Sequence, residues 1–127
     1  MKGTVWTVII LTAVIVAVGI ASTSISANIS HDFSQDLSVV EESIRKENWE
    51  EAMRAVDDMI LEWEETCQWL QIWVNHTDTD DVNMAIERLA AAIELNDKYA
   101  SLIIGAELGE SLRHIYHRDA LTIANIL

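Results

Sequence analysis

The sequence predicts an all-α protein, with an N-terminal transmembrane helix followed by a four-helix domain of two αα-hairpins of tetratricopeptide-like type. The 127 residues include no proline, residues of high helix propensity dominate, and no long alternating β pattern is present. Residues 1–30 are apolar or uncharged apart from Lys2, whereas residues 31–127 are rich in charge. In this second part, apolar residues recur every three or four positions, the spacing of helices with one buried face.

The N-terminal anchor is predicted over residues 1–30. Residues 3–30 carry no charge and residues 5–21 are almost continuously apolar. Residues 5–25 have the length of ~20 residues that a helix needs to cross a bilayer, and Trp6 stands where an interfacial aromatic belongs. The alternative is a cleaved signal peptide, although the apolar region of a signal peptide usually has only ~7–15 residues.

Charge predicts the orientation of the chain and excludes one class of partner. Lys2 precedes the apolar segment and acidic residues follow it, so the positive-inside rule places residues 31–127 outside the cytoplasmic membrane. All 21 acidic residues but only seven of the eight basic ones lie after residue 30, which gives this part a net charge of −14. Such a surface repels phosphate backbones, so nucleic acid is excluded as a partner.

The helices of residues 31–127 are predicted in order from their apolar spacing. The first runs from about residue 31 to 46, with the stripe Phe33, Leu37, Val40 and Ile44. The second covers 49–74 and is followed by a loop at 75–80, where Asp78 or Thr79 is the expected N-cap of the third helix. The third contains Val82, Ile86, Leu89 and Ile93, and the fourth covers about 98–124.

The two short joints between helices resemble each other. Asn48 precedes Ala52 by four positions, and Asn96 precedes Ala100 by four. This repetition, with Asn96 as the counterpart of Asn48, predicts two similar helix–turn–helix units, in which a small residue lets the second helix pack closely. Gly105 and Gly109 on the fourth helix could likewise permit a close helix contact.

The segment EWEETCQWLQIWVNH, residues 62–76, combines the only cysteine with a histidine and three tryptophans. Cys67 cannot form an intramolecular disulfide, and helix geometry places it on the core face. His76 would point nearly opposite to Cys67 and lie ~13 Å further along the axis, which excludes a Cys–His dyad from this segment. The expected core stripe is Trp49, Ala52, Val56, Ile60, Trp63, Cys67, Leu70 and Val74.

A second apolar face is expected at the end of this helix, formed by Trp69, Ile72, Trp73 and His76. One interpretation is that neighbouring helices cover this face. The other is that it is exposed as a partner face for another protein, a second copy or the membrane interface.

The candidate metal ligands are Glu110, His114 and His117, which share one side of the fourth helix at i, i+4 and i, i+3 spacings. His76 and Asp78 could complete such a site. The alternative is that these polar side chains are simply solvated. No other metal site and no cofactor are predicted.

Arg118 and Asp119 fall in the apolar stripe of the fourth helix. Because charges on a core face are normally paired and hydrogen-bonded, the expectation is a buried ion pair between them. A functional polar site is the alternative.

The chain resembles the family of small single-pass membrane proteins of Bacillota called domain of unknown function 4363. The resemblance rests on the anchor and on residues spread over the helices: Trp49 with Ala52, Trp63, Trp73 with His76, Arg88-Leu89, Asp97, Arg118-Asp119 and Asn125-Ile126-Leu127. It implies a membrane-anchored helical domain outside the cytoplasmic membrane, and an accessory subunit of a multi-span membrane protein. It implies no catalytic residues.

The function expected from these observations is that of a membrane-anchored, non-enzymatic interaction or accessory protein. Its partners would be the lipid bilayer, through residues 5–25, and a membrane protein or a second copy. The alternative is an extracytoplasmic metal- or cation-binding sensor. A hydrolase or thiol enzyme is disfavoured, because the sequence has no glycine-rich loop, nucleophile elbow or paired-acid site.

Overall fold

The structure is a computed structural model of residues 1–127. It describes the backbone of residues 1–70 and 76–126, with the side chains of these residues apart from 2, 22–23, 25–30, 69–70, 76 and 118–126. The described residues form four helices and no strand: α1 (Lys2–Arg45), α2 (Trp49–Leu70), α3 (His76–Glu94) and α4 (Lys98–Ile126). The predicted all-α class is confirmed.

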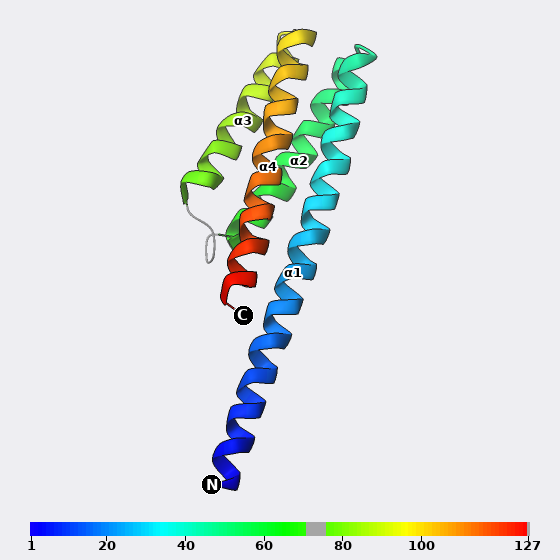
Figure 1. Ribbon diagram of the computed structural model, residues 1–127. Coiled ribbons are helices and arrows are strands. Elements are labelled where there is room, and N and C mark those ends of the chain that lie inside the picture. Colours follow the sequence, from blue (N-terminus) through cyan, green and yellow to red (C-terminus); the bar gives the residue numbers. More distant parts are fainter. Residues whose placement is uncertain (71–75, 127) are drawn as a thin grey trace.

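The helices form an antiparallel bundle in which the chain runs alternately up and down (Figure 1). Short turns pair α1 with α2 and α3 with α4, so the two predicted αα-hairpins are confirmed. The hairpins then pack against each other, α4 against α1 and α3 against α2. The N-terminal part of α1 projects from one end of this bundle as a single apolar rod (Figure 1).

The N-terminal apolar helix and the first bundle helix are continuous. The sequence predicted that the bundle helix begins at about residue 31, but α1 runs unbroken over 44 residues. The connecting stretch 22–30 is rich in Ser, Thr and Asn, which favours helix ends. It contains no Pro or Gly, however, so nothing in it forces the helix to end.

The two turns at the far end of the bundle have the same hydrogen-bond pattern. In the first, the N–H of Asn48 donates to the carbonyl of Ser43 at 2.9 Å, and in the second the N–H of Asp97 donates to that of Ala92 at 3.0 Å. A hydrogen bond of this kind ends the helix and reverses the chain. It requires one residue of the turn to have the positive φ of the left-handed region. These residues are Glu47, with φ of 58°, and Asn96, with φ of 53°.

The second turn is shifted by one position from the expected correspondence with the first. Asn48 corresponds to Asp97 and not to Asn96, and each caps the following helix: Asn48 Oδ1 accepts from the N–H of Glu51 at 3.4 Å, and Asp97 Oδ1 from that of Ala100 at 3.0 Å. The small buried residue that follows is therefore Ala52 in α2 but Ser101 in α4, each fully buried. Ala100 is only half-buried.

The predicted loop over residues 75–80 is wrong from His76 onward, because His76–Glu94 is helical. Asp78 lies in the first turn of α3, where a negative charge is stabilised by the positive end of the helix dipole. The aspartates and threonines that suggested a loop are thus residues that favour a helix start.

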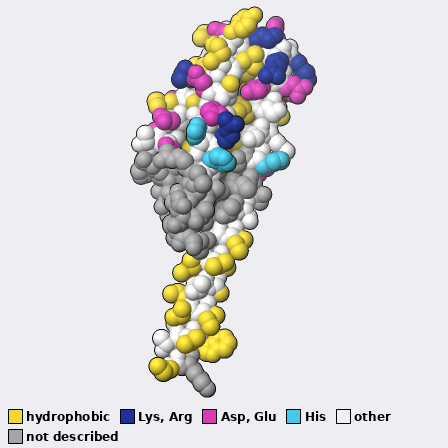
Figure 2. Space-filling view, viewed as in Figure 1, with side chains coloured by type: hydrophobic (Ala, Val, Ile, Leu, Met, Phe, Trp, Pro, Cys, Tyr) yellow, Lys and Arg dark blue, Asp and Glu magenta, His cyan; other side chains and the backbone are white. Residues whose placement is uncertain are grey.

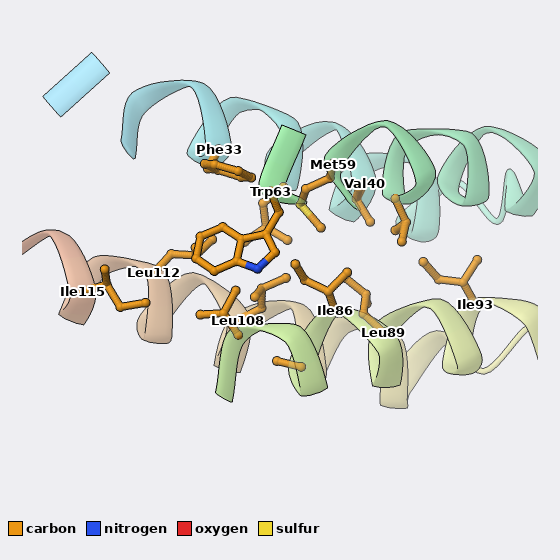
Figure 3. Close-up of a cluster of buried hydrophobic side chains, with 14 of the residues drawn as sticks. Phe33, Val40, Met59, Trp63, Ile86, Leu89, Ile93, Leu108, Leu112 and Ile115 are labelled. Atoms are coloured by element: carbon orange, nitrogen blue, oxygen red, sulfur yellow. The ribbon is translucent and has the colours of Figure 1, made fainter. Parts of the chain in front are cut away.

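Trp63 lies at the centre of the core, between Phe33 of α1 and residues of α3 and α4 (Figure 3). Its ring meets that of Phe33 edge to face at 5.5 Å between centroids, and its Nε1–H donates to Asn83 Oδ1 at 2.6 Å. The remaining fully buried large side chains come from all four helices: Val40, Ile44, Val56, Met59, Val82, Leu89, Ile93 and Leu108. The described buried side chains form one apolar core that holds the four helices together.

Gly105 and Gly109 do allow α4 to approach α1 closely. A methyl group placed on Gly105 would lie 3.6 Å from Glu41 Oε1, and one on Gly109 would lie 3.2 Å from Leu37 Cδ2. These contacts, together with an ion pair of 3.0 Å between Lys98 Nζ and Glu47 Oε1, set the register of the two antiparallel helices.

Candidate functional site

Cys67 is confirmed as a core residue, with only 9% of its surface exposed. Burial raises the pKa of its thiol, and the negative charges of Asp80 and Glu64 raise it further. Since the thiolate is the nucleophilic form, this environment keeps Cys67 in its unreactive protonated form. The side chain of His76 lies outside the described residues.

The candidate metal ligands lie on the outer side of α4. His114 Nε2 is 3.3 Å from Glu110 Oε1, while Arg113 forms an ion pair with the other oxygen of Glu110 and lowers the pKa of that carboxyl. His117 is exposed. The described side chains include no group of three or more His, Cys, Asp or Glu that could hold a metal ion.

Asp78, a possible further ligand in the metal hypothesis, lines the same hollow as His114. Asp78 and Asp81 of α3 line a shallow hollow of about 240 Å³ together with Ser111, His114 and Ile115 of α4. Asp78 and His114 thus line the same hollow. With Glu110 held by Arg113, however, the metal hypothesis gains no support from the described residues.

The two remaining sets of predicted site residues lie outside the described side chains. They are the partner face Trp69, Ile72, Trp73 and His76, and the expected ion pair Arg118 and Asp119. Both sets therefore remain predictions.

Acidic residues of α1 and α2 meet at the end of the bundle nearest the apolar rod. Asp32, Glu62 and Glu65 line a hollow of about 230 Å³ with Phe33 and Thr66. A hydrogen bond with Asp36 raises the pKa of Glu62, and burial and the charges of Asp36, Asp32 and Asp58 add to this rise. Like charges therefore meet unfavourably in this region of the α1–α2 surface.

An exposed apolar patch that the sequence reasoning missed lies at the opposite end, beside the two turns. Leu95, Tyr99 and Ile103 are 79, 82 and 61% exposed. Figure 2 shows apolar side chains both along the rod and at this far end of the molecule. We call these three residues the distal patch. Tyr99 and Ile103 are four positions apart on α4, whereas Leu95 lies in the turn before it. A helical pattern in the sequence could therefore have revealed the pair on α4 but not Leu95.

The distal patch is bordered by paired charges. Lys98 binds Glu47, and Arg88 Nη1 lies 3.7 Å from Glu107 Oε2. Arg45 and Lys46 at the end of α1 are paired with Glu41 and Glu42. An apolar centre with a polar border is the usual composition of a protein–protein interface.

The projecting part of α1 has the composition of a membrane-spanning helix. Gly3–Ala21 has a mean hydropathy of 2.5, and no part of it is buried within the bundle. Its length and composition suit a membrane anchor, and a signal sequence would have the same properties.

No curated protein and no solved structure matches this chain. A family model does match, over residues 20–126, which includes the second half of α1 and all of α2, α3 and α4. The chain belongs to the family described as domain of unknown function DUF4363.

Proposed function

We propose that this protein is a single-pass, membrane-anchored interaction protein without catalytic activity, which presents a helical bundle to another membrane protein. The observation that carries the proposal is the continuity of α1. The same 44-residue helix begins as an uncovered apolar rod at Gly3–Ala21 and ends within the bundle core, through Phe33, Leu37, Val40 and Ile44.

The charges around the apolar segment support an orientation with the bundle outside the cytoplasmic membrane. Lys2 precedes the segment, whereas no Lys or Arg follows it until Arg45. The end of the bundle next to the segment carries the acidic hollow of Asp32, Glu62 and Glu65. Positive charge is favoured on the cytoplasmic side, so this distribution supports an inside N-terminus.

The distal patch is the surface that we propose for the partner. Tyr99 and Ile103 pair in register with the part of α1 near Glu47 and Ser43, because Lys98 contacts Glu47. A helix rises 1.5 Å per residue, so this surface would stand about 33–39 Å above the end of the apolar segment at Ala21. The partner must therefore project a comparable distance from the same side of the membrane.

Restriction to the membrane plane compensates for the small size of the patch. Three side chains bury far less than the ~800 Å² per partner of a stable interface between soluble proteins. Anchoring raises the effective concentration of each protein near its neighbours, so a weak contact can be sufficient. A second copy of the chain is the competing occupant of this surface.

Photo-cross-linking in the native membrane tests the proposal. A benzoylphenylalanine at position 99 should yield a cross-link to a distinct membrane protein, whereas one at Asp57, an exposed residue of α2, should not. Ile103→Glu should then reduce capture at least severalfold. Leu61→Glu is the matched control, because Leu61 of α2 is 62% exposed and Ile103 is 61% exposed.

Two results would contradict this proposal. Equal capture with Ile103→Glu and Leu61→Glu would show that the distal patch is not the binding surface. Cross-links only between identical chains would show that the patch joins two copies. Circular dichroism of both variants should give unchanged helicity, because neither side chain belongs to the buried core.

A further inference from the structure

We infer that the last two turns of α4, residues 120–126, form a second membrane contact beside α1, at the boundary between lipid headgroups and hydrocarbon. This inference rests on the proposed function in one respect, since it requires that the apolar segment of α1 spans the bilayer. It adds a lipid-binding segment that lies far from that anchor in the sequence, at the other end of the chain.

The register of α4 along α1 carries the inference. Lys98 contacts Glu47, Gly105 lies against Glu41, and Gly109 lies against Leu37. The sum of the paired residue numbers is thus nearly constant, at 145 or 146, as expected for antiparallel helices with the same rise. A step of one residue toward the C-terminus of α4 therefore corresponds to a step of one residue toward the N-terminus of α1.

This pairing extends to the level of the membrane segment. Continuing it from the contact of Gly109 with Leu37 to Ile126, where α4 ends, places Ile126 beside Ile20. Ile20 belongs to the apolar segment Gly3–Ala21. Figure 1 likewise shows the C-terminal end of α4 reaching down α1 to the start of the projecting rod.

Both helices are free of charged residues at the end nearest the membrane segment. In α1 no residue from 3 to 30 is charged, and in α4 the last charged residue is Asp119, which pairs in register with Ala27. Residues 120–127 have the sequence ALTIANIL, in which half of the residues are Leu or Ile. The lowest acidic residue of α1 is Asp32, about 7.5 Å further from the bilayer than the level of Asp119. Below the level of Asp119 neither helix carries a charge, which is the pattern expected if both enter the bilayer.

The depth of this contact follows from helix geometry. Residues 120–126 pair with positions 26 to 20 of α1, so they cover about 9 Å along the axis. The headgroup region on one side of a bilayer is roughly 5–8 Å thick. Residues 120–126 would therefore occupy the headgroup region and the first layer of hydrocarbon. Their helical backbone satisfies its own hydrogen bonds, a condition for entering lipid.

Lipid is a better match for this segment than another protein. The segment is uncharged, and its last two residues lie at the level of Ile20 and Ala21, the end of the helix that is itself exposed to lipid in the proposed arrangement. A protein partner at this level would have to be membrane-embedded and would exclude lipid from both helices. A second copy of the chain is one such partner, and the experiment separates it from lipid.

Depth-dependent fluorescence quenching tests the inference on the full chain in phosphatidylcholine–phosphatidylglycerol vesicles. In a Cys67→Ala background, single cysteines at 120–126 are labelled with an environment-sensitive fluorophore, and lipids carrying a nitroxide near the headgroup serve as quenchers. Ala21→Cys is the positive control in the anchor. Ala106→Cys is the negative control, because Ala106 is exposed on α4 and pairs with position 40 of α1, about 28 Å above Ala21.

The expected result is quenching at several positions of 120–126 to at least half of that at Ala21, with at most one tenth at Ala106. Quenching at Ala21 but at none of 120–126 overturns the second contact and leaves the anchor intact. No quenching at Ala21 overturns the proposed anchor itself. Disulfide cross-links between chains at 120–126 without lipid quenching also overturn the inference, since a second copy then covers the segment. Helicity of each labelled chain is checked by circular dichroism.

Discussion

At the scale of single residues, the contact between Glu62 and Asp36 is a place where the folded chain accepts an unfavourable interaction. The carboxyl of Glu62 hydrogen-bonds to that of Asp36 across α1 and α2, and this contact raises the pKa of Glu62 above its ordinary value of 4.5. One of the two groups must hold a proton for such a bond to form. At neutral pH the native state therefore carries a repulsion that the unfolded chain largely avoids.

Replacing Glu62 by Gln should stabilise the fold in a pH-dependent way. Because the pKa of Glu62 is raised on folding, the native state binds more protons than the unfolded state, and stability falls as pH rises through the raised pKa. Glu62→Gln should therefore raise the free energy of unfolding at pH 7, by about a few tenths of a kcal/mol for so exposed a group. Near pH 3.5, where the carboxyl is protonated in both states, the gain should vanish.

Urea unfolding at both pH values measures this difference. Asp57→Asn is the control, because it removes one negative charge from an exposed site of α2 that is not among the groups acting on Glu62. An equal gain in both variants would mean that the total charge of the bundle, and not the Asp36 contact, determines the effect. A gain that persists at pH 3.5 would contradict the assigned cause.

At the scale of helices, the contact between α4 and α1 depends on the absence of two side chains. Gly105 and Gly109 lower the intrinsic stability of α4, because glycine costs ~0.8–1 kcal/mol in a helix relative to alanine. In return they let α4 lie close to Leu37 and Glu41. The two glycines are not equivalent, because a methyl group would have more room at Gly105 than at Gly109.

Gly105→Ala should stabilise the protein, and Gly109→Ala should do so less or not at all. A methyl group at 105 meets its nearest neighbour, Glu41 Oε1, at an ordinary 3.6 Å, so the gain should approach about 0.5–1 kcal/mol. At 109 the methyl group lies 3.2 Å from Leu37 Cδ2, which must move. Thermal unfolding in one detergent compares the two variants. If both substitutions raise the melting temperature equally, the close contact between position 109 and Leu37 does not reduce the stability gained from alanine.

The helices could be predicted well from the sequence where apolar spacing decides the structure. The stripe through Ala52, Val56, Trp63 and Cys67 is buried as expected, since one face of an amphipathic helix has to leave water. Met59 was missed, although it is fully buried, and Ile60, its expected counterpart, is only partly buried. Which of two adjacent residues is buried depends on the rotation of the helix about its own axis. Only the packing of the neighbouring helices determines this rotation.

Helix ends were predicted less well, because they depend on local bonds that several residue types can make. The sequence pattern makes Asn96 the counterpart of Asn48, but in the structure Asn96 is the left-handed residue and Asp97 is the cap. Asn suits both positions, so the sequence alone left the register of the second turn one position in error. The distal patch was missed for a related reason, since exposure depends on which face the neighbouring helices leave uncovered.

At the scale of the whole molecule, the bundle and the apolar rod are energetically separate although they share one helix. Among the described side chains the core begins at Phe33, and no part of Gly3–Ala21 is buried in the bundle. The burial of apolar surface that stabilises the bundle therefore does not involve the rod. Removal of residues 1–27 would therefore leave the described core residues in place.

A chain that begins at residue 28 should consequently fold. In the same detergent, its melting temperature should lie within about 5 °C of that of the full chain, a shift that corresponds to roughly 1 kcal/mol for a domain of this size. Circular dichroism as a function of temperature provides the measurement. A much lower melting temperature, or the loss of a cooperative transition, would show that the bundle needs residues 1–27 for its stability.

The unbroken path of α1 also has a mechanical consequence for the anchored chain that we propose. A helix without a hinge acts as a lever, so the bundle cannot keep its direction when the anchor changes its inclination. Helices respond to bilayer thickness by tilting, and a change of about 10° would shift a surface roughly 39 Å above the membrane sideways by about 7 Å. Leu95, Tyr99 and Ile103 would then meet or miss a neighbour according to the thickness of the surrounding lipid.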